Sequence, residues 1–296
     1  MADDEHARLF AEHRRAMTGA AYRILGSLAA AEDAVQETWL RWAEVDLATV
    51  RNPRAYLLRA ASRQALNAAR HQARLREDYV GPWLPEPVGD VTVLGSRATG
   101  DPADAADLAE SVSLAMLVVL ESLSPPERAA FVLREVFGLP FDEVATALGR
   151  TPEAARQLVH RAREHVRERA PRHPVDRSTH REVTERFLAA AAGGSIEDVV
   201  RLLSPDVVLV TDGGGKRRAA LRPIHGVEKV LRFARGVMER PDAPVSLRLG
   251  DVNGEAAILM ARTDGLDGTV TLVVDDGLIT AIYLVRNPDK LAHVLA

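Results

Sequence analysis

Two stretches of this 296-residue chain concentrate arginine, whose planar guanidinium group is well suited to binding phosphate. Residues 51–76 contain seven arginines and no acidic residue, and residues 150–172 contain seven arginines and three glutamates. Phosphate contacts respond to local charge density, so both stretches indicate nucleic-acid binding although the whole chain has a formal net charge of −4. A solvated helix face explains either stretch taken alone, but the presence of two favours a nucleic-acid ligand.

The second stretch has the pattern of a helix that contacts bases in a DNA groove. Apolar residues at positions i, i+4, i+7 and i+11, from Ala155 to Val166, give this helix one buried side. The polar side carries guanidinium and amide groups, so we expect Arg156 and Arg161 to contact guanine or phosphate and Gln157 to contact adenine. The full set expected at this contact is Thr151, Arg156, Gln157, His160, Arg161 and Arg163.

The first stretch predicts a helix that follows the phosphate backbone. An amide at Asn52 and an aromatic ring at Tyr56 stand where this helix begins, and such groups hydrogen-bond to an unstacked base and stack on it. The alternative for Tyr56 is packing in the protein core. The set expected to contact DNA here is Arg51, Asn52, Arg54, Tyr56, Arg59, Arg63 and Arg70.

Enzyme chemistry has weaker support. Proton abstraction needs a base, for which Asp212, His225 and Asp264 are candidates, and an oxyanion partner such as Tyr283, but no spacing selects among them. The chain has no cysteine, which excludes disulfides, a thiolate nucleophile and cysteine-ligated metals. Glycine-rich phosphate-binding motifs are also absent from the sequence. We therefore expect no enzymatic activity, no cofactor and no metal ion.

The arginine-rich stretches must be positioned by helices. Residues 5–76 predict three of them, with a break at Gly26-Ser27 and a new start at Pro53. Residues 110–170 are helical again. Ser124 and Glu127 form a capping box, and Thr151 caps the helix that carries the second stretch after a short turn containing Gly149. This order predicts a helix-turn-helix.

Residues 79–110 have the composition of a linker. Proline and glycine recur, and residues 77–110 contain eight acidic residues and one arginine. The segment Trp83–Pro87 places a tryptophan and a leucine among prolines, which in extended form would dock on a surface; a chance aromatic in a solvated tether is the alternative.

The chain changes character after residue 171. Helical patterns cover residues 179–192 and 226–239, and strand-like runs follow at 245–249, 256–261, 270–274 and 278–285. Asn253-Gly254 and Asp276-Gly277 predict tight hairpin turns. Helices followed by an antiparallel meander predict an α+β domain.

Nothing in the sequence indicates a membrane segment. The chain has no run of about 18 apolar residues, and its acidic start lacks the apolar core of a signal peptide. We expect a cytoplasmic protein.

Several motifs resemble those of a known family. Residues 32–40 (EDAVQETWL) resemble the polymerase-clamp-binding region of extracytoplasmic-function (ECF) sigma factors, the minimal two-domain bacterial transcription initiation factors. Residues 51–57 (RNPRAYL) resemble the start of the helix that reads the −10 element, and residues 154–163 resemble the −35 recognition helix. Many relatives have a basic residue where this chain has Leu158, which predicts an altered −35 contact set.

The rest of the chain resembles the SigJ-type branch, in which a SnoaL-like (NTF2-like) domain follows the sigma core. The motifs that carry this resemblance are Trp83–Pro87, Asp212–Lys216 and Asn287–Leu291. The resemblance implies two all-α sigma domains, sigma2 at residues 1–78 and sigma4 at 111–172. The acidic linker at 79–110 lies between them, and an α+β SnoaL-like cone follows at 173–296.

The resemblance also implies partners and sites. The chain is expected to bind core RNA polymerase and promoter DNA, with the C-terminal domain modulating activity in cis and no separate anti-sigma protein. The expected polymerase contacts are Asp33, Gln36, Glu37 and Trp39, with Trp42 as a further apolar anchor or, alternatively, both tryptophans as core. The expected regulatory contacts, placed outside the domain core, are Trp83, Leu84, Pro85, Asp212, Gly213, Gly214, Gly215, Lys216, Asn287, Pro288, Asp289 and Lys290.

Other functions stay open at this point. The C-terminal domain is alternatively a sensor with a small-molecule ligand in its pocket, or an isomerase-like or hydrolase-like enzyme. A repressor with one helix-turn-helix is a third hypothesis, but it leaves the first arginine-rich helix and the acidic linker unexplained.

Overall fold

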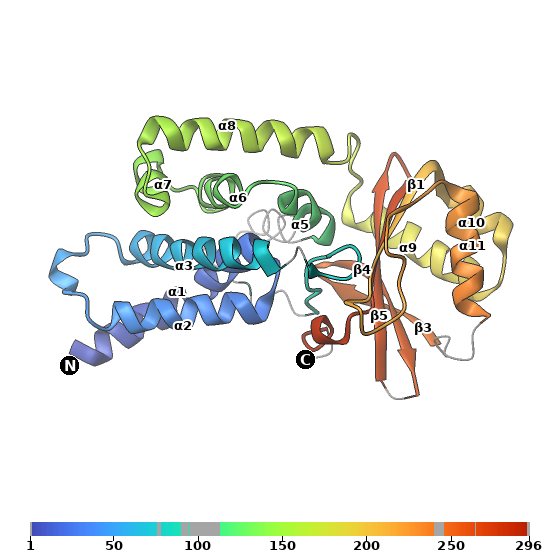
Figure 1. The fold of residues 1–296 in the computed structure, drawn as a ribbon, viewed down its shortest axis with the longest axis horizontal. Coiled ribbons are helices and arrows are strands. Elements are labelled where there is room, and N and C mark those ends of the chain that lie inside the picture. The colour runs from blue at the N-terminus through green and yellow to red at the C-terminus, as the bar shows by residue number, and fades with distance from the viewer. Residues whose placement is uncertain are drawn as a thin grey trace. The chain divides into compact units, whose positions relative to one another are not determined.

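The computed structural model describes residues 2–75, 78–89, 94, 113–239, 246–263 and 265–294 (Figure 1). The chain forms two compact units. The first comprises residues 1–77, 91–112 and 116–170, and the second comprises residues 78–90, 113–115 and 171–296. None of the described helices is both long and apolar enough to cross a membrane.

The first unit begins with three helices that share one core. They are α1 (Ala2–Leu25), α2 (Leu28–Trp42) and α3 (Pro53–Leu75), with the short 3-10 helix η1 (Leu47–Thr49) before α3. Ser27 caps α2 by accepting a hydrogen bond from the Ala30 amide at 3.3 Å, which fixes the predicted break between α1 and α2. The core between the helices contains Met17, Val35, Trp42, Leu57 and Ala61.

The second part of the first unit contains the predicted helix-turn-helix. Its elements are α6 (Pro125–Phe131), the π-helix η4 (Val132–Val136), α7 (Phe141–Leu148), α8 (Pro152–Arg169) and, from residue 116 onward, α5 (Leu114–Glu121). Gly149 adopts a positive φ of 63°, which ends α7 in a left-handed cap, and Thr151 then caps α8. The π-helix η4 interrupts a segment that the sequence predicts as regular helix.

The second unit is an α+β domain with one six-stranded sheet in the order β2-β1-β6-β5-β4-β3. The strands are β1 (Leu203–Asp212), β2 (Ile224–His225), β3 (Ser246–Val252), β4 (Glu255–Arg262), β5 (Gly265–Asp275) and β6 (Leu278–Val285). The predicted meander β3–β6 is confirmed. Its turns have φ of 54° at Asn253 and 49° at Asp276, the backbone that Asn-Gly and Asp-Gly pairs adopt.

One pairing lies outside the predicted meander, because β1 runs parallel to β6. The connection between them passes through the whole domain, so no local turn signal announces it. Helices α9 (Arg177–Ala192), α10 (Ile196–Leu202) and α11 (Val227–Met238) contribute Val183, Leu202 and Val230 to a core that includes Leu272 and Ile282 of the sheet.

Candidate functional site

Helix α8 presents its polar side to solvent. Ala155, Val159 and Ala162 are buried. The residues expected at the −35 element are exposed, namely Thr151, Arg156, Gln157, His160, Arg161 and Arg163. The Thr151 side chain accepts a hydrogen bond from the Ala154 amide at 3.2 Å, so it caps the helix. The helix therefore has the buried back and polar front that groove binding requires.

Two of the expected DNA-binding arginines on α8 are paired with acids of the same unit. Arg161 Nε donates to Glu127 Oε1 at 3.0 Å, and Arg163 Nη2 donates to Glu135 Oε1 at 2.8 Å. Burial alone would raise the pKa of Glu127, but hydrogen bonds from Ser124 and Arg161 outweigh it and lower that pKa. These two arginines link α8 to α6 and η4, a role that the sequence did not indicate.

Helix α2 carries an exposed ridge with both acidic and apolar groups. Asp33, Gln36 and Glu37 are exposed, and Leu40, one turn further, is 61% exposed. The sequence analysis did not select Leu40, although its spacing from Gln36 and Glu37 places it on the same face. Such a ridge suits a basic partner surface with an apolar centre.

The two tryptophans of α2 have different surroundings. Trp39 is half-buried, and its ring lies 5.0 Å from that of Phe10. Trp42 is 1% exposed, and its indole nitrogen donates to the His6 carbonyl at 3.0 Å. The expectation that Trp42 anchors a partner is therefore wrong, because its whole side chain is used in the core.

The arginines of α3 are divided between solvent and α7. Arg54 and Arg70 of α3 are exposed, as is Arg51 just before this helix, as expected for phosphate contacts. Arg59 instead forms an ion pair with Glu143, and Arg63 Nη2 donates to the Thr146 carbonyl at 2.5 Å. In this structure the last two therefore bind the neighbouring helix, and Arg63 caps its carboxyl end.

Asn52 and Tyr56 each have a structural contact at the start of α3. Asn52 Oδ1 accepts a hydrogen bond from the Ala55 amide at 3.0 Å, so the side chain caps the helix. Tyr56 is half-buried against Trp42, with 5.4 Å between ring centres, and Arg59 lies over the Tyr56 ring. Asn52 is therefore exposed although it caps the helix, and Tyr56 is partly exposed although it packs against Trp42.

The second unit brings together, around one carboxylate, the three motifs Trp83–Pro87, Asp212–Lys216 and Asn287–Leu291. Asp212, at the end of β1, is fully buried. It accepts hydrogen bonds from the Tyr79 hydroxyl at 2.6 Å, the Leu84 amide at 2.9 Å and the Gly214 amide at 3.0 Å. Lys290 Nζ forms an ion pair with it at 2.7 Å. A buried carboxylate is tolerated here because its oxygens are matched by donors and a cation.

Lys290 connects the tail motif to the linker motif. Its ammonium group donates to the Leu84 carbonyl at 2.5 Å and lies 3.9 Å from the centre of the Trp83 ring. Asn287 Nδ2 donates to the Tyr79 hydroxyl at 2.9 Å. Burial and the neighbouring Asp212 carboxylate raise the pKa of Tyr79, so its hydroxyl stays protonated as a donor.

A second anchor holds the linker residues that follow. Val88 N donates to Asn253 Oδ1 at 3.1 Å, and Asn253 N donates to the Val88 carbonyl at 2.7 Å. Gly89 N donates to the His293 carbonyl at 2.8 Å. A Cβ on Gly89 would lie 2.1 Å from the Val294 carbonyl oxygen, so only glycine fits this approach.

These contacts correct the expectation that the loop, tail and linker motifs lie outside the domain core. Leu84, Asp212, Asn287 and Lys290 are all buried. Only Lys216 and Asp289 form an exposed pair, at 2.6 Å. The polar groups pair with one another, which offsets the cost of burying them.

The beginning of the predicted linker is thus part of the α+β unit. The sequence analysis missed Tyr79 and Asn253, and the only signal for Tyr79 was its position four residues before Trp83. The acidic remainder of the predicted linker, apart from Leu94, lies outside the described residues.

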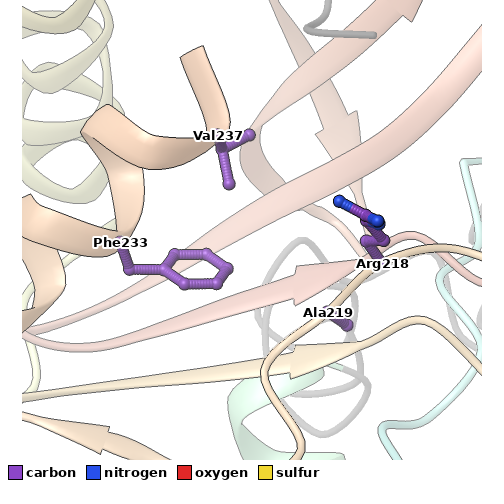
Figure 2. Close-up of a pocket in the computed structure, with 4 residues that line it drawn as sticks. All are labelled: Arg218, Ala219, Phe233 and Val237. Carbon is purple, nitrogen blue, oxygen red and sulfur yellow. The ribbon is translucent and has the colours of Figure 1, made fainter. Parts of the chain in front are cut away.

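The candidates for catalysis do not form a site in the described part of the chain. Asp212 is used in the linker contact, His225 is exposed, and Asp264 lies outside the described residues. Burial raises the pKa of Tyr283 to about 12. A hollow of about 230 Å³ is lined by Phe233 and Val237 of α11, opposite Arg218 and Ala219 (Figure 2). These four residues offer one cation and apolar surface, without a paired acid and base.

Comparison with known families identifies the two helical parts. The model described as "Sigma-70 region 2" matches residues 9–75, and the model described as "Sigma-70, region 4" matches residues 113–166. The predicted order of domains, two sigma domains followed by an α+β domain, is confirmed by these matches together with the sheet topology.

Relatives extend this similarity over nearly the whole chain. The ECF RNA polymerase sigma factor SigJ of Mycobacterium tuberculosis is 42% identical over 287 residues, which cover 94% of this chain and 90% of that protein. Its crystal structure matches with a TM-score of 0.75 at 36% identity, covering 95% of this chain and 96% of the other. The probable ECF sigma factor SigI of the same species is 30% identical over 94% of this chain and 92% of its own length. This chain therefore belongs to the ECF family of RNA polymerase sigma factors.

Proposed function

We propose that this sigma factor directs promoter-specific initiation through three surfaces of its first unit. The ridge of α2 at Asp33, Gln36, Glu37 and Leu40 binds core polymerase, with Trp39 behind it. The start of α3 contacts the −10 element, and the exposed side of α8 contacts the −35 element. Support comes from the exposure of these side chains on helices whose opposite sides are buried.

We further propose that the SnoaL-like domain modulates this activity in cis by holding the linker. The observation that carries the proposal is the buried Asp212 carboxylate, which binds Tyr79, the Leu84 amide and Lys290. An extended chain spans at most about 3.5 Å per residue, so fixing residues 79–89 shortens the chain that connects the two DNA-binding domains. The distance that the two DNA-binding domains can span then depends on the C-terminal domain. Promoter choice depends on this distance.

This arrangement supplies control within one chain, so no separate anti-sigma protein is needed. The contact is made by residues of the linker, the Asp212 loop and the tail, and it uses protein groups alone. The C-terminal domain therefore acts here as a protein-binding module, in preference to an enzyme.

Run-off transcription with core polymerase tests the proposal. Lys290→Met removes the buried cation that joins tail and linker, whereas the matched control Lys216→Met removes a cation from the exposed pair with Asp289. We expect Lys290→Met to change promoter activity and Lys216→Met to match the wild type. Removal of the chain from Asn287 onward should have the effect of Lys290→Met or a larger one.

Crosslinking distinguishes the possible results. A photo-crosslinker at Trp83 should join the linker to the tail in the wild type and lose this crosslink in Lys290→Met. If Lys290→Met abolishes the crosslink while transcription stays at the wild-type level on every promoter tested, control through the linker is wrong.

A further inference from the structure

Two arginines of the helix-turn-helix lie over the ring of one phenylalanine. The guanidinium carbon of Arg134, in η4, is 4.7 Å from the centre of the Phe141 ring, and that of Arg156, in α8, is 5.5 Å from it. Phe141 is the first residue of α7 and is half-buried. A cation within about 6 Å of a ring centre is attracted by the negative face of the ring. Phe141 thus connects the first helix of the motif to the side chain expected to contact guanine.

Arg134 and Arg156 each have a further contact within their own domain. Arg134 Nη1 donates to the Leu139 carbonyl at 3.0 Å, which holds Arg134 across the turn before α7. Arg156 Nη1 lies 3.5 Å from Glu153 Oε1, and the Arg156 side chain is 54% exposed. Arg156 is therefore supported by a ring and a carboxylate of its own domain while half of it faces solvent.

A cation–π contact uses no hydrogen bond of the guanidinium, and Arg156 Nη1 makes a long one, 3.5 Å, to Glu153 Oε1. The N–H groups lie in the plane of the guanidinium and point outward from its edge, which is the geometry that binds guanine O6 and N7 in a bidentate manner. An arginine already held by neighbouring side chains loses less rotamer freedom when it binds a base. Arg161 is held by a shorter hydrogen bond, from its Nε–H to Glu127 Oε1 at 3.0 Å, and has no ring contact of this kind among the described residues.

We propose that Phe141 is a positioning residue for −35 recognition and that its ring holds the Arg156 guanidinium in the place from which it approaches the base edge. The proposal rests on the proposed function, in which Arg156 contacts the −35 element. Phe141 itself needs no contact with DNA for this role.

The test uses full-length protein bound to core polymerase and a pool of promoter DNA with a randomised −35 element. The bound DNA is sequenced to give the base preference at each position. Arg156→Ala should remove the preference at one or two adjacent positions. Phe141→Leu, which keeps an apolar side chain without a ring, should weaken the preference at those same positions by about two- to fivefold. Phe141→Tyr keeps the ring and should match the wild type.

The double variant separates positioning from packing. In the Arg156→Ala background, Phe141→Leu should cause no further change in base preference, since the residue that it positions is gone. A spectroscopic readout is the Arg156 Nε–H resonance of the free protein, which is shifted by the ring current. It should move toward the shift of a free arginine in Phe141→Leu and stay in place in Phe141→Tyr.

Each outcome decides the matter. The inference is overturned if Phe141→Leu leaves the Arg156-dependent positions unchanged, or if it flattens every position equally in both backgrounds. If Arg156→Ala alters no position, then Arg156 does not contact −35 bases, and that part of the proposed function fails together with this inference. Thermal unfolding checks that each variant folds, and Phe141→Met replaces Phe141→Leu if the latter does not.

Discussion

Lys290 Nζ lies 2.7 Å from Asp212 Oδ2, and the two side chains, 11% and 0% exposed, form a buried ion pair. The same ammonium group donates a hydrogen bond to the Leu84 carbonyl of the linker. Removing one partner of such a pair leaves the other charge buried without compensation. We therefore expect this contact to contribute to the stability of the second unit.

The first prediction concerns the stability of the second unit. Lys290→Met should lower the free energy of unfolding of this unit by about 3–5 kcal/mol, because Asp212 loses its cation. Lys216→Met, at an exposed pair, should cost less than about 1 kcal/mol. Chemical denaturation followed by tryptophan fluorescence measures both values. Equal losses of unfolding free energy in the two variants would contradict the conclusion that Lys290 neutralises a buried charge.

The second prediction is a pH dependence that originates at His180. Burial lowers the pKa of His180, whose Nε2 lies 2.9 Å from the Leu272 carbonyl oxygen. The unfolded chain therefore binds a proton more readily than the folded one, so this residue makes stability fall as pH drops below about 6.5. His180→Gln should show a shallower fall in unfolding free energy between about pH 7 and 5. The control is His160→Gln, at an exposed position, which should follow the wild-type curve.

The third prediction concerns the exposed ridge of α2. Reversing Asp33 and Glu37 to lysine should abolish co-purification with core polymerase, and Leu40→Ala should weaken it by about 2 kcal/mol, as expected of an apolar anchor. These side chains are exposed, so the thermal midpoint should stay within about 2 °C of the wild type. Undiminished binding of the double variant at moderate salt would refute the ridge as the polymerase contact.

The fourth prediction separates base contacts from phosphate contacts on α8. Arg156→Ala should reduce discrimination between a specific and a scrambled −35 element by about 1–3 kcal/mol. Arg167→Ala, also exposed, should weaken binding to both sequences alike and flatten the dependence of affinity on salt. Binding titrations at several salt concentrations give both quantities. An equal loss on both sequences for Arg156→Ala would make it a phosphate contact.

The fifth prediction follows from the pairing of α3 with α7. Glu143→Ala releases Arg59, so it should raise the affinity of the polymerase-free protein for DNA by up to about fivefold at low salt, with the gain vanishing at high salt. Asp142→Ala removes an exposed neighbouring acid and controls for the general change in charge. A gain in DNA affinity of the same size in both variants would show that it comes from the change in net charge and not from the release of Arg59.

Local signals in the sequence were sufficient for most of the fold. The predicted break at Gly26-Ser27 separates two helices, the capping groups at Ser124 and Thr151 begin helices in the structure, and the Asn253-Gly254 pair forms its hairpin. Each of these signals acts over a few residues and depends on backbone chemistry alone.

Contacts between distant segments could not be derived in this way. The parallel pairing of β1 with β6 and the hydrogen bond between Tyr79 and Asp212 join residues far apart in sequence, and no pattern within either segment names the other. The same holds for Arg59 and Arg63. Their spacing predicts an exposed basic face, whereas their contacts depend on the position of α7.

The backbone contact between Gly89 and the last turn of the chain sets an order of events during synthesis. Gly89 N donates to the His293 carbonyl and Gly89 fits against Val294, which lies 205 positions further along the chain. At a translation rate of about 5–20 residues per second, this second anchor of the linker is missing for roughly 10–40 s after residue 89 is made. The helical domains of a nascent chain are therefore synthesised before the contact between Gly89 and His293 can form, and every new molecule passes through an interval without this anchor.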